Sequence, residues 1–166
     1  MTRRLQHSSH MLATSLSAIR AARPTLAPVP RAIVEAICLA EGSIGPAERV
    51  AQTLGLRNRF ELARLLLRER LPSLPRMAKW ATVLAWVAAA ERDGVSLCRM
   101  AFRADRYPAA CYRLVKEVTG LCWAEVRIRG SAWVEREFLR EFSPSSERRQ
   151  AEVASSVASR PSLKAL

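Results

Sequence analysis

Apolar positions along most of the chain recur with the period of an α-helix. From Arg31 onward, apolar residues are spaced three or four positions apart, and glycine or proline residues separate one such stretch from the next. No stretch alternates Val, Ile, Thr or aromatic residues with polar ones, which is the pattern of a half-buried strand. The pattern therefore predicts an all-α fold.

The most informative helical stretch covers residues 57–70. Its charged side chains fall on a strip about 60° wide, because each helical residue advances about 100°. These side chains are Arg57, Glu61, Arg64 and Arg68. Apolar residues fill most of the remaining positions, which predicts a helix sunk in a core with one narrow arginine edge exposed. That edge suits the DNA major groove, although a buried helix with a merely solvated edge has the same pattern.

Turn and breaker residues divide the folded part of the chain into segments. We expect a first helix-turn-helix lobe over residues 29–74, a long linker helix over residues 75–93, and a second helix-turn-helix lobe over residues 94–130. A C-terminal amphipathic helix follows over residues 131–143. The predicted architecture is two small helix-turn-helix lobes joined by the linker helix.

Both ends of the chain have the composition of disordered segments. Residues 1–28 form a basic arm with four arginines and no acidic residue, and residues 144–166 are rich in Ser, Ala and charge. The arm could alternatively be a leader or the linker to a further domain, and a short helix near residues 11–21 is compatible with its pattern. We expect both segments to be disordered.

Charge indicates the class of partner. The 166 residues include 27 Lys and Arg against 15 Asp and Glu, which gives a formal net charge of +12. A chain this basic is expected to bind polyanions, with nucleic acid as the first candidate and an anionic membrane surface as the second. The longest apolar run, residues 81–90, is far shorter than the roughly 20 residues that a membrane span needs. We therefore expect DNA and no membrane.

The residue types that carry metal or catalytic chemistry do not form known motifs. The cysteines have no CxxC spacing, and we expect each to be a small buried apolar residue in a reducing compartment: Cys38, Cys98, Cys111 and Cys122. The only histidines, His7 and His10, lie in the N-terminal arm. Phosphate-binding, nucleophile-elbow and zinc-protease motifs are also missing from the sequence. We expect no metal, no cofactor and no enzymatic activity.

Two stretches carry a resemblance to a known family. Residues 112–130, YRLVKEVTGLCWAEVRIRG, resemble the end of the DNA-binding domain of AraC-type transcription regulators, where a helix ending in T-G-L precedes an E-x-R closure. Residues 48–77 are similar to the first helix-turn-helix of that family and the hydrophobic segment after it, and the resemblance spans residues 31–130. The family usually has G-F where Ala-Asp-Arg stands at 104–106, and the turn there is one residue short.

The resemblance implies two recognition helices, residues 57–70 and 107–119, in successive major grooves of one duplex, about 34 Å apart. The first helix and its turn supply Arg57, Asn58, Arg59, Glu61, Arg64 and Arg68 to DNA. The second supplies Tyr107, Tyr112, Arg113 and Lys116. Phosphate contacts, which outnumber base contacts, are expected from Arg76, Lys79, Arg99, Arg103 and Arg106.

Together these expectations describe a sequence-specific DNA-binding transcription regulator in the bacterial cytoplasm, associated with the nucleoid. RNA polymerase or a separate sensor protein would be a further partner. The alternative is a protein-interaction adaptor that keeps an AraC-like fold and binds DNA only non-specifically. The apolar side of the C-terminal helix, from Trp133 to Phe142, motivates the alternative because it could form a dimer or partner surface, although it could also simply close the core.

Overall fold

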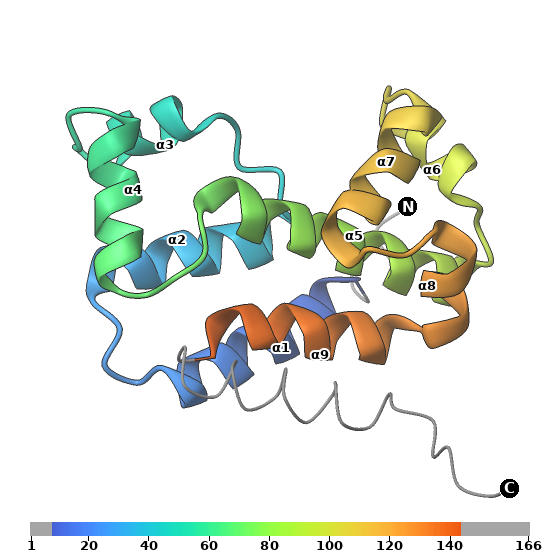
Figure 1. Cartoon of the computed structure of the whole chain (residues 1–166), viewed down its shortest axis with the longest axis horizontal. Helices are drawn as coiled ribbons and strands as arrows, with labels where there is room; N and C mark the ends of the chain where they lie inside the picture. The colour runs from blue at the N-terminus through green and yellow to red at the C-terminus, as the bar shows by residue number, and fades with distance from the viewer. Residues whose placement is uncertain (1–7, 144–166) are drawn as a thin grey trace, which may run out of the picture.

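Helices make up the part of the chain that the structure describes, which is residues 8–143 of the computed structural model (Figure 1). In chain order they are α1 (Ser8–Ala22), α2 (Pro28–Leu39), α3 (Ala47–Thr53), α4 (Arg59–Arg68), α5 (Leu74–Asp93), α6 (Leu97–Arg103), α7 (Pro108–Thr119), α8 (Trp123–Arg129) and α9 (Ser131–Phe142). No strand occurs between residues 8 and 143, so the all-α prediction is confirmed. The predicted disorder of residues 1–7 and 144–166 falls outside the described residues.

Helix α5 is the centre of the core. It is apolar on nearly every side, and it packs against α1, α2 and α9 as well as α6, α7 and α8. Met77, Val83 and Val87 are completely buried. Its 20 residues span about 30 Å at the α-helical rise of 1.5 Å per residue. Despite this apolar centre, none of the helices within residues 8–143 has both the length and the hydropathy to cross a bilayer.

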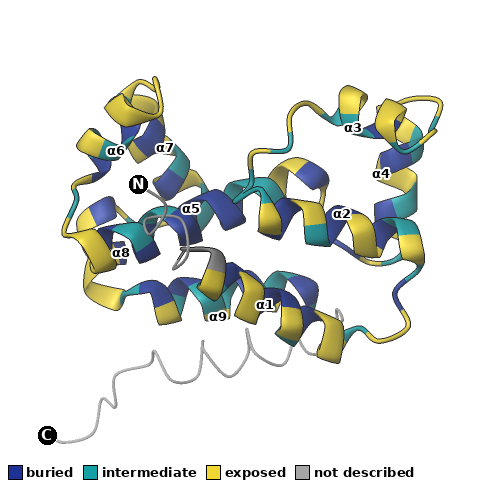
Figure 2. Cartoon of the chain, turned by 180° about the vertical axis from the view of Figure 1, so that it is seen from behind, coloured by how far each residue is buried: buried dark blue, intermediate teal, exposed yellow. Residues whose placement is uncertain are grey.

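Two pairs of short helices lie at opposite ends of α5. Figure 1 shows α3 and α4 near one end and α6 and α7 near the other, on the same side of α5. Helices α1 and α9 run along the opposite side, and the reverse view in Figure 2 shows the same arrangement. Buried residues line the sides of α1, α5 and α9 that meet one another (Figure 2). The core is therefore centred on α5, with α1 and α9 on one side of it and both helix pairs projecting from the other.

The prediction that residues 1–28 are disordered is wrong for residues 8–28. Residues 8–22 form α1, which packs against α2, α5 and α9. Leu12, Leu16 and Ile19 recur every three or four positions and are buried, so they give α1 one apolar side. The buried Ser15 hydroxyl also donates a hydrogen bond to Glu135 Oε1 of α9 at 2.8 Å. Basic composition suggested disorder, but this apolar side finds a partner surface in the core.

The C-terminal helix α9 uses its apolar side within the chain. Val134, Phe138 and Phe142 are buried, and the two phenylalanine rings meet edge to face with centroids 5.1 Å apart. The N-terminus of α9 is capped by Glu91 of α5, whose carboxylate accepts hydrogen bonds from the Ser131 amide, at 2.7 Å, and the Ser131 hydroxyl. The surface that could have formed a dimer therefore closes the core of this chain.

Arg23, in the connection between α1 and α2, joins the ends of two distant helices. Its guanidinium donates to the carbonyl of Phe142, at the end of α9, at 3.0 Å and to the carbonyl of Glu69, at the end of α4. Carbonyls at a helix C-terminus lack intrahelical donors and carry the negative end of the helix dipole. The partly buried cation therefore satisfies both ends and anchors α4 to the core.

We expect Arg23→Ala to lower the free energy of unfolding by about 2 to 3 kcal/mol, because charge-assisted hydrogen bonds to two helix ends are lost. The matched control is Arg20→Ala, which removes an exposed ion pair with Glu35 and should cost less than about 1 kcal/mol. Urea denaturation followed by circular dichroism measures both changes. Equal losses for the two variants would contradict the role given to Arg23.

Gly42, just after α2, allows the chain to pass close to α5. Its φ of +81° lies in the left-handed region, and a Cβ atom there would overlap the Ala78 carbonyl and the Thr82 hydroxyl. The Thr82 hydroxyl also donates to the Glu41 carbonyl at 3.2 Å. Gly45 has a similar φ of +78° but open space around it.

Substituting each of these two glycines distinguishes the cost of backbone strain, which both positions have, from the cost of steric overlap, which only Gly42 has. Gly45→Ala should lower the free energy of unfolding by about 1 to 2 kcal/mol, the cost of a left-handed alanine. We expect Gly42→Ala to cost at least about 2 kcal/mol more, since α5 must also move away from the new methyl group. Thermal and urea unfolding of the two variants measures the difference, and similar losses would show that the close approach to α5 is not needed.

Candidate nucleic-acid interface

The two helix pairs are built on the same local plan. Helices α3 and α6 each have seven residues, and each ends in a Schellman turn. In the first, the Leu56 amide donates to the Ala51 carbonyl at 2.9 Å, and in the second the Arg106 amide donates to the Ala101 carbonyl at 2.9 Å. The left-handed position is Gly55 in one and Asp105 in the other. The second turn, residues 104–107, is one residue shorter than the first, residues 54–58.

The start of α4 is fixed by two residues that we expected to contact DNA. The Asn58 side chain accepts hydrogen bonds from the amides of Phe60 and Glu61, both at 3.0 Å. The Glu61 carboxylate in turn accepts from the amide of Arg57 at 2.8 Å. Asn58 and Glu61 are therefore the cap of α4, and the helix begins at Arg59, two residues later than predicted.

The prediction that α4 is sunk in the core with a narrow arginine edge is wrong. Among its apolar residues only Leu62 and Leu66 are buried, whereas Phe60 is 61% and Leu67 74% exposed. The helix packs chiefly against α3 at the edge of the molecule, so only one side of it is covered. Sequence patterning could not foresee this, because it cannot tell how many sides of a helix have neighbours.

The uncovered surface of α4 divides into two neighbouring strips, at about 100° per residue. The basic strip consists of Arg57, Arg64 and Arg68, all exposed. The apolar strip consists of Phe60, Ala63 and Leu67, also exposed. Arg59 lies beyond the apolar strip, and its guanidinium lies 5.0 Å from the centre of the Phe60 ring.

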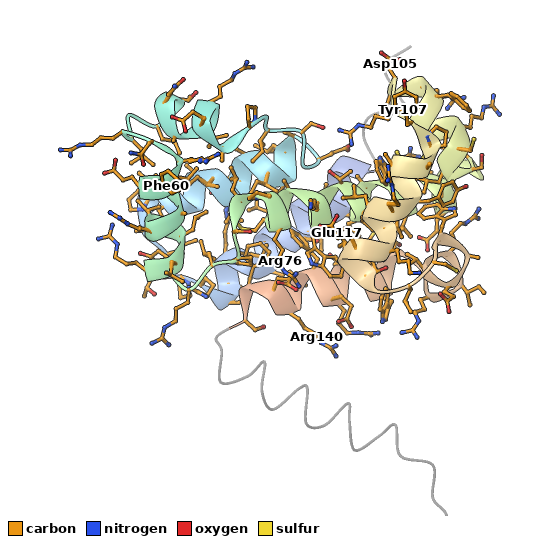
Figure 3. The ribbon with its side chains drawn as sticks, turned by 45° about the horizontal axis from the view of Figure 1, so that its top comes forward. Phe60, Arg76, Asp105, Tyr107, Glu117 and Arg140 are labelled. Atoms are coloured by element: carbon orange, nitrogen blue, oxygen red, sulfur yellow. The ribbon has the colours of Figure 1, made fainter. Side chains whose placement is uncertain are left out.

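Helix α7 exposes a mixed basic and aromatic surface. Cys111 and Val115 hold it to the core, while Tyr112, Arg113 and Lys116 are exposed. Tyr107, expected to be the first residue of this helix and to contact DNA, is the N-cap residue and is 85% exposed. Figure 3 shows Tyr107 and Asp105 together at the outer tip of the α6–α7 pair.

Three arginines that we expected to contact phosphates are exposed beside α7. Arg99 and Arg103 are exposed on α6, and Arg106 is exposed in the turn before α7. The Arg106 guanidinium lies 5.9 Å from the ring centre of Trp86 on α5, which holds it against the scaffold. Together with Arg113 and Lys116 they form one basic end of the molecule.

Arg76 and Lys79, expected to hold DNA phosphates, are ion-pair partners within the chain. Both start from α5: Arg76 donates two hydrogen bonds of 2.7 Å to Glu141 of α9, and Lys79 pairs with Glu117 of α7. The hydrogen bonds to Glu141 raise the pKa of Arg76 above its usual value. These two cations fix α9 and α7 to α5, and Figure 3 shows Arg76 beside α9.

Among the described helices, ion pairs are concentrated in some and are not found in others. Within residues 8–143 the ion pairs join side chains of α1, α2, α5, α7 and α9: Arg20–Glu35, Arg76–Glu141, Lys79–Glu117, Arg92–Asp93 and Arg140–Glu137. In the same range, the basic side chains of α4, α6 and the outer side of α7 have no ion-pair partner. The helices that carry these unpaired cations, α4 in one pair and α6 and α7 in the other, lie on the same side of α5 (Figure 1), so positive charge without an ion-pair partner forms two clusters there.

The cysteines show no arrangement for catalysis or metal binding. Among the described residues, no three His, Cys, Asp or Glu side chains gather as metal ligands would, and His10 is exposed on α1. Cys38 and Cys111 are buried as expected, Cys98 is half-buried, and Cys122 is exposed, so the expectation of burial is wrong for Cys122. Burial raises the pKa of the Cys38 thiol from 9.0 to about 12.

These environments predict a fixed order of thiol reactivity. At pH 8 we expect a disulfide reagent such as Ellman's reagent to modify Cys122 rapidly and Cys38 only after unfolding, because the reactive thiolate of Cys38 is suppressed by burial. Absorbance stopped-flow with and without urea, and Cys122→Ser as the control, measures the order. Rapid loss of the Cys38 thiol in the native protein would contradict this.

Comparison with known proteins gives no relative from which a function could be inferred. No protein-family model matches the chain, and comparisons with curated proteins and with solved structures also return no match. The resemblance to AraC-type regulators therefore depends on the two stretches quoted above, and function must be argued from the site itself.

Proposed function

We propose that the protein binds duplex DNA and regulates transcription, with α4 and α7 entering successive major grooves. The observation that supports this most is the pair of uncompensated basic clusters on one side of α5. Helices α4 and α7 lie apart along α5 on the same side of it (Figure 1), as two helices that enter successive major grooves would need to. A +12 chain would also be drawn to DNA over a long range.

In this proposal each residue of the two helix pairs that we expected to contact DNA has a defined role. Base edges are contacted by the basic strip of α4 and by three residues of α7, since Arg can bond bidentately to guanine. The α7 residues are Tyr112, Arg113 and Lys116. Phosphates are contacted by Arg59, Arg99, Arg103, Arg106 and Tyr107, which flank the two helices. Asn58 and Glu61 position α4, while Arg76 and Lys79 brace the scaffold and do not touch DNA.

The start of α7 is suited to close approach. Ala109 and Ala110 are exposed in its first turn, so no bulky side chain would keep the helix from the groove floor. Base contacts in helix-turn-helix proteins are concentrated near the start of the recognition helix. Tyr112 and Arg113 follow within the next turn.

The proposed setting is the bacterial nucleoid, with RNA polymerase or a separate sensor protein as a further partner. The alternative, an adaptor that binds DNA only non-specifically, is supported by the apolar strip of α4, which has no evident role in reading bases. The two functions differ in one measurable property: a regulator enriches particular sequences from a random duplex pool, and an adaptor does not.

Two substitutions should separate base contacts from phosphate contacts. On duplexes selected from a random pool, Arg64→Ala should lose about 1 to 3 kcal/mol of binding free energy and relax sequence preference. Arg99→Ala should weaken all sequences alike and make the salt dependence about one unit shallower. For the unmodified chain we expect log affinity to fall with log salt at a slope of about −4 or steeper, equivalent to at least about five phosphate contacts.

Fluorescence anisotropy at a series of salt concentrations measures these effects. The control is Arg136→Ala, because Arg136 is exposed on α9, on the other side of α5, and its loss should not change DNA affinity beyond a general charge effect. Binding that is insensitive to salt, or that Arg136→Ala weakens as much as Arg64→Ala does, would overturn the proposed interface.

A further inference from the structure

A shallow apolar groove continues from the apolar strip of α4. It has a volume of about 270 Å³ and lies between α4, the start of α3 and the start of α5. Leu62, Leu66, Leu71, Leu74 and Pro75 contribute to its walls, while Ala63 and Leu67 of the strip form its outer edge. From Arg59 to Leu67 the groove runs along about 12 Å of helix, or two turns.

Exposed apolar side chains in this arrangement differ from isolated ones. Phe60 and Leu67 are seven residues apart and therefore lie on the same side of α4, with Ala63 between them. Single exposed apolar residues are common on protein surfaces, but a contiguous row beside a groove marks an interaction site. The spacing matches the way a partner helix lays apolar residues into a groove.

The groove is separate from the proposed DNA-binding strip. Arg57, Arg64 and Arg68 lie on the side of the apolar strip that faces away from the groove. Around the helix axis and relative to Phe60, positions 64 and 68 are turned by about 40° and 80° in one direction. Positions 63 and 67, at the edge of the groove, are turned by about 60° and 20° in the other direction. One helix thus presents two chemically different surfaces. A partner in the groove and a duplex on the basic strip would approach from different directions.

Charge decides which partner fits. Arg59 is the charged residue among the described residues that line the groove, and none of them is acidic. A second copy of this chain would bring another +12 against the same rim, which is repulsive, whereas carboxylates would be attracted and steered towards it. The fit is to an acidic partner.

We propose that the groove between α3, α4 and α5 docks an acidic amphipathic helix of another protein. Two turns of that helix place apolar residues against Leu67, Ala63 and Phe60, and a flanking carboxylate faces Arg59. The apolar residues of the site do not belong to the basic strip, and Arg59 is the residue that the site shares with the proposed phosphate contacts.

The test uses a displayed library of helical peptides, selected against the full-length protein. The peptides have fixed leucines at positions i, i+3 and i+7 and random residues elsewhere. We expect the selected peptides to be enriched in Asp and Glu, and their affinity to fall at least tenfold for Leu67→Glu and at least threefold for Arg59→Ala. The matched control is Ile128→Glu, because Ile128 on α8 is 86% exposed and remote from the groove; it should leave affinity unchanged within twofold.

Each other occupant gives a distinct result that overturns the proposal. Selected peptides without acidic enrichment, no selected peptides, or equal losses for Leu67→Glu and Ile128→Glu would show that the groove is not an acidic-helix site. Concentration-dependent dimerisation that Leu67→Glu abolishes, measured by analytical ultracentrifugation, would assign it to a second copy. Displacement of the selected peptides by a synthetic peptide of residues 144–166 would assign it to the chain's own C-terminal segment. Duplex affinity of the same variants, measured in parallel, reports separately on the proposed DNA binding.

Discussion

The need to enclose α5 on all sides governs this structure. A helix that is apolar around most of its circumference is stable in water only when neighbours cover each side, because the hydrophobic effect is proportional to the apolar area removed from water. Helices α1, α2 and α9 pack against α5, and so do α6, α7 and α8. The basic N-terminal stretch is ordered from residue 8 because α1 is one of these neighbours.

The contacts that enclose α5 also determine which of the described basic side chains have no ion-pair partner. The acidic partners Glu141, Glu117 and Glu91 are used to fix α9 and α7 to α5 and to cap α9. The helix pairs at the two ends of α5 contribute mostly arginine and lie outside this network. Positive charge is therefore concentrated where the molecule projects furthest, which is the distribution that a polyanion-binding protein needs.

Helix α4 is the element in which stability and function meet. It has few core contacts of its own, and its two ends are secured by polar interactions: the cap formed by Asn58 and Glu61, and the bond from Arg23 to the carbonyl of Glu69. A helix held by its ends can leave most of its sides free. The basic and apolar strips of α4 are both exposed for this reason.

The sequence by itself determined the helices from α2 onward, their turns and the excess of positive charge, because periodicity, capping and Schellman turns depend on residues close together in the chain. It predicted the basic residues of α6 and α7 correctly as exposed. Only the tertiary structure decided that Arg76 pairs with Glu141, 65 residues away, and that Phe60 and Leu67 remain exposed. Such outcomes depend on which distant segments become neighbours: an apolar residue is buried only where another element covers it, and a cation is free only where no acid is brought beside it.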